Sequence, residues 1–313
     1  MSRAGRARRI ASAAAYGGGG LTALTALGAG VIAAEVKLAR RWIGQPFGKG
    51  HDTSGEFGAG TGEPIQLAVL GDSSAVGLGA ETPEQTPGVV LARGLAALSG
   101  RRVQLTMVAV VGAESSALDG QVDRLLERVP SPDVALVMVG ANDVTHRVRP
   151  AVSVRHLGAA VTRLREAGCE VVVGTCPDLG TIEPVAQPLR LIARRWSRDL
   201  AAAQIVATVE AGGRTVSLGD LLGPEFRTTS GDLFSADKFH PSGAGYAIVA
   251  AALLPSICAA VGLWPDGGTE RAPDVRRGEG VGPISVAAVA AAEDPGSEVS
   301  AAEVGGRQRG PRG

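Results

Sequence analysis

The chain has 313 residues, which is enough for one large domain with additional segments, and its 31 Lys and Arg residues equal its 31 Asp and Glu residues. A net charge of zero leaves no positive surplus for a phosphate backbone, and an aromatic content of 3% is too low for a platform on which bases stack. Nucleic acid is therefore not expected as a partner.

The N-terminal segment, residues 1–43, has the features of a membrane-directed sequence. An arginine cluster ends at Arg8 and Arg9, and residues 10–34 after it carry no formal charge, a length that can cross a bilayer. Large aliphatic residues are sparse in this stretch, so three readings stay open: an uncleaved membrane anchor, an export signal cleaved near "VIAAE", and a soluble leader rich in Gly and Ala. The arginine cluster favours the first two, and we expect an exported or membrane-anchored protein of the cell envelope, or a secreted one.

Composition divides the rest of the chain into three parts. Residues 44–63 are rich in glycine and polar and are expected to form a linker. Residues 265–313 lack apolar periodicity and are rich in Gly, Pro, Glu, Arg and Ala, which is typical of a disordered tail. Residues 64–264 between them form the predicted domain.

Short apolar runs alternate with helical patterns throughout this domain. The expected strands are "IQLAVL" (65–70), "VQLTMVAVV" (103–111), "VALVMV" (134–139), "EVVVGT" (170–175) and "RTVSL" (214–218). The expected helices lie near 85–98, 115–129, 152–167, 187–211 and 242–261. The strands are apolar throughout, as parallel strands covered on both faces should be. This alternation predicts an α/β fold, a doubly wound three-layer α/β/α sandwich.

The cysteines and histidines do not form a pattern typical of a metal site. An extended strand separates Cys169 from Cys176, so these two cannot reach each other, and Cys258 lies on a predicted helix. We expect three unpaired thiols. The four histidines are scattered and there is no Cys-x-x-Cys pair, so a metal site is not expected.

Four short polar blocks follow the predicted strands or precede the last helix. They are "GDSS" (71–74), "VGAESS" (111–116), "GAND" (140–143) and "DKFHPSGAGYA" (237–247). The first three follow parallel strands, whose carboxyl ends meet at one edge of the sheet. The fourth joins them if its loop folds over that edge.

These blocks contain the residue types that serine catalysis needs. Ser73 is the candidate nucleophile, His240 the base that takes its proton, and Asp237 the carboxylate that orients the imidazole. The main-chain N–H groups of Ser73 and Gly112 and the side-chain amide of Asn142 could bind the developing oxyanion. Asp72 and Asp143 are expected to orient the loops, and His146 to be a surface residue.

The blocks resemble those of the SGNH (GDSL-type) hydrolase superfamily. Gly71-Asp72-Ser73, Gly112, Gly140-Ala141-Asn142-Asp143 and Asp237-x-x-His240 match its four blocks in order, over residues 64–262. The second block departs from the family pattern, because "VAVVG" lacks the Asn that often precedes its Gly. The resemblance implies a five-stranded parallel, flavodoxin-like sheet, a Ser73–His240–Asp237 triad, ester or thioester hydrolysis, and no cofactor.

The expected activity is hydrolysis of short- to medium-chain acyl esters, with a small-molecule or lipid ester as the substrate. Two other classes of function remain open. The same site could act as an acyltransferase or deacetylase on cell-envelope glycans or lipids, or the domain could be a membrane-tethered binding module. Residues 182–196 are interpreted as an amphipathic helix entered through prolines, with a wall of the acyl pocket as the alternative.

Overall fold

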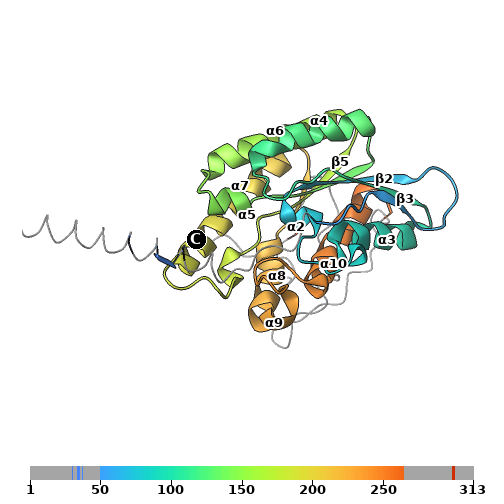
Figure 1. Ribbon diagram of the computed structural model, residues 1–313. Coiled ribbons are helices and arrows are strands. Elements are labelled where there is room, and N and C mark those ends of the chain that lie inside the picture. The colour runs from blue at the N-terminus through green and yellow to red at the C-terminus, as the bar shows by residue number, and fades with distance from the viewer. Residues whose placement is uncertain (1–29, 31–33, 36, 38–49, 264–297, 300–313) are drawn as a thin grey trace, which may run out of the picture.

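Five parallel strands form the centre of the sheet in the computed structural model, which describes residues 30, 34–35, 37, 50–263 and 298–299 (Figure 1). They are β2 (Ile65–Gly71), β3 (Val103–Met107), β4 (Val134–Met138), β5 (Glu170–Gly174) and β6 (Arg214–Val216). Their order in the sheet is β3-β2-β4-β5-β6, the flavodoxin-like order. The predicted α/β sandwich with this parallel core is confirmed.

Over the described residues the sheet has seven strands and not five, because a short strand is added at each edge. Strand β1 (Gly55–Phe57) pairs antiparallel with β3, and β7 (Glu298–Val299) pairs parallel with β6. Strand β1 lies in the segment 44–63 that composition marks as a linker, so part of that segment belongs to the sheet. Phe57 packs against the core, which a three-residue strand beside glycines does not reveal in the sequence.

The remaining domain predictions concern the two ends of the chain. The leader 1–43 and the tail 265–313 lie almost wholly outside the described residues. The structure therefore does not test the predicted membrane-directed leader or the predicted disordered tail.

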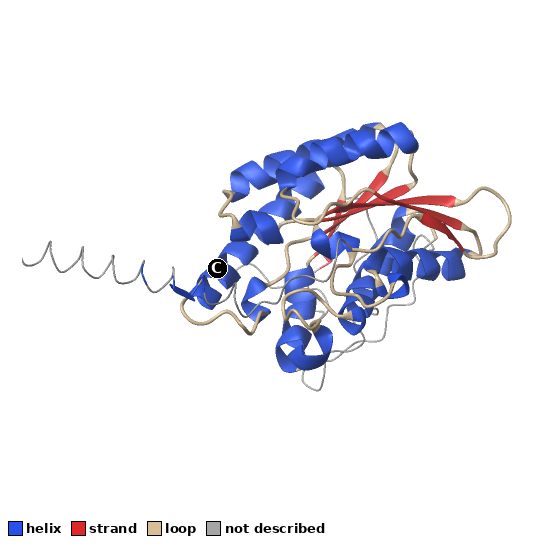
Figure 2. Ribbon diagram, in the orientation of Figure 1, coloured by secondary structure: helices blue, strands red, loops and turns tan. Residues whose placement is uncertain are grey.

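Helices cover both faces of the sheet (Figure 2). The helices are α2 (Ser73–Val76), α3 (Pro87–Ser99), α4 (Leu118–Arg128), α5 (Ala141–Thr145), α6 (Pro150–Glu166), α7 (Leu189–Glu210), α8 (Leu218–Thr228), α9 (Ser230–Leu233) and α10 (Gly243–Ala260). Helices α4 and α6 lie over one face, and α3, α8 and α10 over the other (Figure 1). Alternate strand residues supply the two cores: Leu67 and Val69 face α3 and α10, and Ala68 and Leu70 face α4 and α6.

Helix α10 is apolar around its whole circumference because it is a core helix. Among the described helices it is the one long and apolar enough to cross a membrane, and 56% of it is buried inside the domain. It packs on α3, α8 and the sheet. Its Cys258, like Cys169 and Cys176, is buried and unpaired, which confirms the prediction of three free thiols.

Candidate active site

Gly71 ends β2 in a conformation and a space that only glycine accepts. Its φ is +132°, and a Cβ there would lie 1.8 Å from the carbonyl oxygen of Met138 on the neighbouring strand β4. The main-chain N–H of Asp72 donates to that same oxygen at 2.9 Å. Strand β2 is therefore pinned to β4 where it ends, and Ser73 begins α2 at the carboxyl edge of the sheet.

Asp72 caps the single turn of α2. Its Oδ1 accepts a 2.9 Å hydrogen bond from the main-chain N–H of Ser74, and its side chain is buried. Burial raises the pKa of Asp72 to about 6, although the bond from Ser74 and the nearby imidazole of His240 lower it in part. The carboxylate orients the loop around Ser73, as expected.

The loop before α10 brings His240 to Ser73 across 167 positions of sequence. Nε2 of His240 lies 3.0 Å from Oγ of Ser73, and Nδ1 lies 2.6 Å from Oδ2 of Asp237. All three residues are buried, none more than 7% exposed. The structure thus places the three predicted residues in one line of hydrogen bonds.

Three further hydrogen bonds hold the other oxygen of Asp237. Its Oδ1 accepts from Oγ of Ser235 at 2.7 Å and from the main-chain N–H groups of Phe239 and His240 at 2.9 Å each. Burial alone would raise the pKa of Asp237, but the bonds from His240, Phe239 and Ser235 outweigh it and lower the pKa to about 2. Asp237 is therefore ionised at neutral pH, and Ser235 is a supporting residue that the sequence reasoning missed.

Gly112 lies in a turn that is hydrogen-bonded to α5, the short helix that contains Asn142. Gly112, with φ +82°, is the third residue of a turn closed by a 3.1 Å bond from the N–H of Ala113 to the carbonyl of Val110. The amide Nδ2 of Asn142 donates to the carbonyl of Ala113 at 3.0 Å. The N–H of Val110 donates in turn to the carbonyl of Gly71 at 3.0 Å, which ties this turn to the end of β2.

Asp143 and His146 have the structural and surface positions expected for them. The buried carboxylate of Asp143 accepts from the N–H of Ser115 at 3.0 Å and from Oγ of Ser153 at 2.6 Å, so it joins the Gly112 loop to α6. The side chain of His146 is 53% exposed and pairs with Glu114 at 2.7 Å.

Two buried glutamines support the strand ends, and the sequence analysis did not identify them. On α4, Gln121 accepts from the N–H of Gly71 at 2.7 Å and donates to its carbonyl at 2.9 Å. On α7, Gln204 accepts from the N–H of Cys176 at 2.7 Å and donates to the carbonyl of Val139 at 2.8 Å. Each side chain therefore satisfies main-chain groups that the sheet leaves free where a strand ends.

An apolar cavity of about 90 Å³ adjoins these residues. Its polar end contains Asp72, Ser74 and His240. Its apolar wall includes Met138, Leu179, Ile182, Leu222, Phe226 and Val249. Of the segment 182–196 only Ile182 lines this cavity, whereas Leu189 packs elsewhere at the start of α7. That segment is thus mainly the proline-led helix predicted for it.

No group of three or more His, Cys, Asp or Glu side chains is placed to hold a metal ion in the part of the chain that the structure describes.

The raised pKa of Asp72 predicts a pH dependence of stability. Between pH 3.8 and about 6, the folded protein holds a proton on Asp72 that the unfolded chain has lost. The free energy of unfolding therefore falls as the pH rises through this window, by up to about 3 kcal/mol at 1.36 kcal/mol per pKa unit. Asp72→Asn keeps a capping oxygen but does not titrate, so its stability should fall less over the same range. Urea unfolding followed by circular dichroism from about pH 4 to pH 7 checks this; parallel curves for both proteins would contradict it.

Comparison with known proteins identifies the family. The sequence profile of the GDSL-like lipase/acylhydrolase family matches residues 69–248. A GDSL-like esterase of Mycobacterium tuberculosis is 47% identical over 186 residues, which are 59% of this chain and 59% of that protein. The chain thus aligns with less than two thirds of the length of this relative.

Solved structures also resemble the chain. A lipase/acylhydrolase from Enterococcus faecalis is 19% identical, with a TM-score of 0.47, over 62% of this chain and 95% of its own. An acetylxylan esterase from Geobacillus stearothermophilus is 20% identical, with a TM-score of 0.47, over 65% of this chain and 95% of its own. The family match covers more than half of the chain and contains Ser73, Gly112, Asn142, Asp237 and His240. The chain belongs to the GDSL-like lipase/acylhydrolase family.

Proposed function

We propose that the protein is a carboxylic ester hydrolase that forms an acyl-enzyme on Ser73. The observation that carries this proposal is the buried line of hydrogen bonds from Asp237 through His240 to Oγ of Ser73, at 2.6 and 3.0 Å. Membership of a family of lipases and acylhydrolases supports it, as does the resemblance to a GDSL-like esterase.

The first half of the proposed reaction transfers the acyl group to the serine. Oγ of Ser73 attacks the ester carbonyl carbon while Nε2 of His240 takes its proton. The ionised Asp237 holds Nδ1 of the imidazole and stabilises the imidazolium that forms. When the tetrahedral intermediate collapses, the bond to the alcohol oxygen breaks, and His240 returns the proton to the leaving alcohol.

The second half releases the acid. His240 takes a proton from a water molecule, the hydroxide bonds to the acyl carbon, and the bond to Oγ of Ser73 breaks as the proton returns to the serine.

Three donors are proposed for the oxyanion: the N–H groups of Ser73 and Gly112 and the amide of Asn142. An amide nitrogen carries two hydrogens, and the bond to Ala113 uses one, so a second remains for a substrate oxygen. The turn at Gly112 is joined to Asn142 of α5 and to Gly71, which supports their acting together. Removing one such donor typically costs about 3–4 kcal/mol of transition-state stabilisation.

The apolar cavity beside His240 is proposed to hold the acyl chain. At about 90 Å³ it is smaller than the roughly 150 Å³ apolar cavity that accommodates a benzene ring. Its size and its largely apolar lining therefore favour short- to medium-chain acyl groups.

Ser73→Ala tests the nucleophile. We expect the wild-type protein to hydrolyse p-nitrophenyl butyrate at neutral pH, and the variant to lose at least about a thousandfold in kcat/KM, because the attacking oxygen is missing. Ser99→Ala, at the end of α3, is the control and should keep full activity. Equal rates in the wild type and Ser73→Ala would contradict the proposal. Activity seen only with an added acceptor alcohol would instead indicate acyl transfer.

Substitutions of Leu222 test whether the cavity holds the acyl chain. Leu222→Ala should raise the kcat/KM ratio of p-nitrophenyl octanoate to butyrate by enlarging the cavity, and Leu222→Phe should lower it. Leu221→Ala is the matched control, because Leu221 is equally buried, at 5%, but does not line the cavity. Both alanine variants are expected to lose about 2–5 kcal/mol of stability, so the ratio and not the absolute rate is compared. An unchanged ratio in both Leu222 variants would place the acyl chain elsewhere.

We further propose that residues 1–43 direct the protein to a membrane or out of the cell. The support is the arginine cluster followed by the uncharged residues 10–34. Glu35 accepts a 2.8 Å hydrogen bond from the N–H of Leu189 at the start of α7. Cell fractionation and N-terminal sequencing should find the protein in the membrane fraction, or outside the cell beginning shortly after Ala34. Soluble cytosolic protein that begins at Met1 or Ser2 would contradict this.

A further inference from the structure

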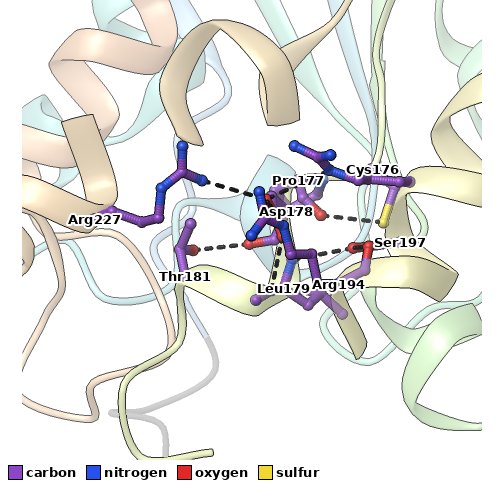
Figure 3. Close-up of polar contacts among 10 residues, drawn as sticks. Cys176, Pro177, Asp178, Leu179, Thr181, Arg194, Ser197 and Arg227 are labelled. Atoms are coloured by element: carbon purple, nitrogen blue, oxygen red, sulfur yellow. Dashed lines mark hydrogen bonds and ion pairs between the residues drawn. The ribbon is translucent and has the colours of Figure 1, made fainter. Parts of the chain in front are cut away.

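Three arginines converge on one buried carboxylate outside the serine site. Asp178 follows β5, and its side chain is 1% exposed. Its Oδ2 lies 3.4 Å from Nε of Arg194, 3.7 Å from Nε of Arg198 and 3.4 Å from Nη1 of Arg227. Figure 3 shows Arg194 and Arg227 directed at Asp178 from two different helices, α7 and α8. Its Oδ1 is occupied by a 2.9 Å bond from the N–H of Gly180.

The cluster carries two more positive charges than negative ones. In the described part of the chain, Arg194, Arg198 and Arg227 have no ion pair with any other carboxylate. Arg194 and Arg198 are four residues apart on α7, and like charges at this spacing destabilise a helix. One guanidinium would be enough to neutralise Asp178. The other two therefore leave donors and charge for which the described residues supply no second carboxylate.

The guanidinium groups are open to solvent, and two residues that they contact, Asp178 and Gly223, line the active-site cavity. The side chains of Arg194, Arg198 and Arg227 are 41%, 51% and 40% exposed. Asp178 and Gly223 both line the cavity that reaches His240. A Cβ on Gly223 would lie 3.1 Å from Nη1 of Arg227, so this guanidinium packs against a residue of the cavity lining.

We propose that Arg194, Arg198 and Arg227 form an anion subsite that binds an oxyanion, such as a carboxylate, on the acyl part of the ester substrate. This inference rests on the proposed hydrolysis at Ser73. Guanidinium groups bind carboxylates through paired N–H donors, and Asp178 holds the three side chains together before the substrate arrives. The subsite makes an acyl chain with a charged end a better substrate than a neutral chain of the same length.

A pair of esters that differ by one carboxylate tests the subsite. The substrates are p-nitrophenyl hexanoate and the mono-p-nitrophenyl ester of adipic acid, with octanoate and suberate as a longer pair. Wild-type protein should prefer the charged member of at least one pair. Arg194→Gln combined with Arg227→Gln should lower that preference about tenfold, mainly through KM, while the neutral ester is hydrolysed as before. Raising the salt concentration should weaken the preference in wild type and leave the neutral ester unaffected.

Arg195→Gln is the matched control. Arg195 is the neighbour of Arg194 on α7, but its side chain is 82% exposed and pairs with Asp199. It should keep the full preference. Arg198→Gln, which removes the most exposed of the three arginines, is a second variant if the double variant does not fold, and it should lower the preference in the same direction.

The result that would overturn the subsite is hydrolysis of the neutral ester with no preference for either charged ester. An equal preference in wild type, Arg198→Gln and the double variant would overturn it as well. If the wild-type protein hydrolysed none of the four esters, the proposed hydrolysis itself would be contradicted. Failure of the subsite and failure of the proposed hydrolysis therefore give different results.

Discussion

The main chain of Gly71 approaches Met138 so closely that no side chain fits between them, and the arrangement of the site depends on this approach. Strands β2 and β4 end side by side because of it. The peptide groups of Gly71 then bond to Gln121 on α4 and to Val110, the first residue of the Gly112 turn. One glycine thus joins three of the four sequence blocks, and a Cβ at this position would separate all of them.

The fourth block depends on a second close approach. Gly79, with φ +101°, lies so near the His240 loop that a Cβ would be 2.6 Å from the carbonyl oxygen of Pro241. The hydroxyl of Tyr246 donates to the carbonyl of Leu78 at 2.7 Å, which fastens α10 to the segment that follows α2. Ser73 and His240 therefore come from distant parts of the sequence but are both held by the short segment that includes α2, Leu78 and Gly79. The imidazole is positioned by packing around its backbone and not only by its hydrogen bonds.

The parts of the fold that could be predicted from sequence are those with long, regular patterns. The five central strands and helices α3, α4, α6, α7 and α10 are runs whose apolar spacing is visible without a structure. Helices α2 and α5 are single turns, too short for any periodicity, and their caps look the same as ordinary turns. Strand β1 exists only because the edge of β3 offers unpaired backbone groups, which is a tertiary effect.

The supporting side chains of the site escaped prediction for a related reason. Gln121 follows Leu118 by three positions and therefore lies on the buried face of α4. A polar residue at such a position indicates a buried hydrogen-bonding role, so Gln121 could have been identified from the sequence. Ser235 lies two residues before Asp237, but many serines precede aspartates on surface loops. The arginines around Asp178 come from α7 and α8, and a linear sequence does not show that two helices converge on one carboxylate. Reactive residues are recognisable by type and order, whereas those that hold them are defined by contacts.

The three buried cysteines have a consequence for where such a protein can work. Burial raises the pKa of Cys169 to about 12 and that of Cys258 to about 11, and it raises the pKa of Cys176 as well. Exchange with a disulfide requires a thiolate on an accessible sulfur, and these groups offer neither. The native fold contains no disulfide, so its stability does not depend on the redox poise of the surrounding compartment. Buried thiols of this kind resist disulfide exchange in an oxidising compartment as well as in a reducing one.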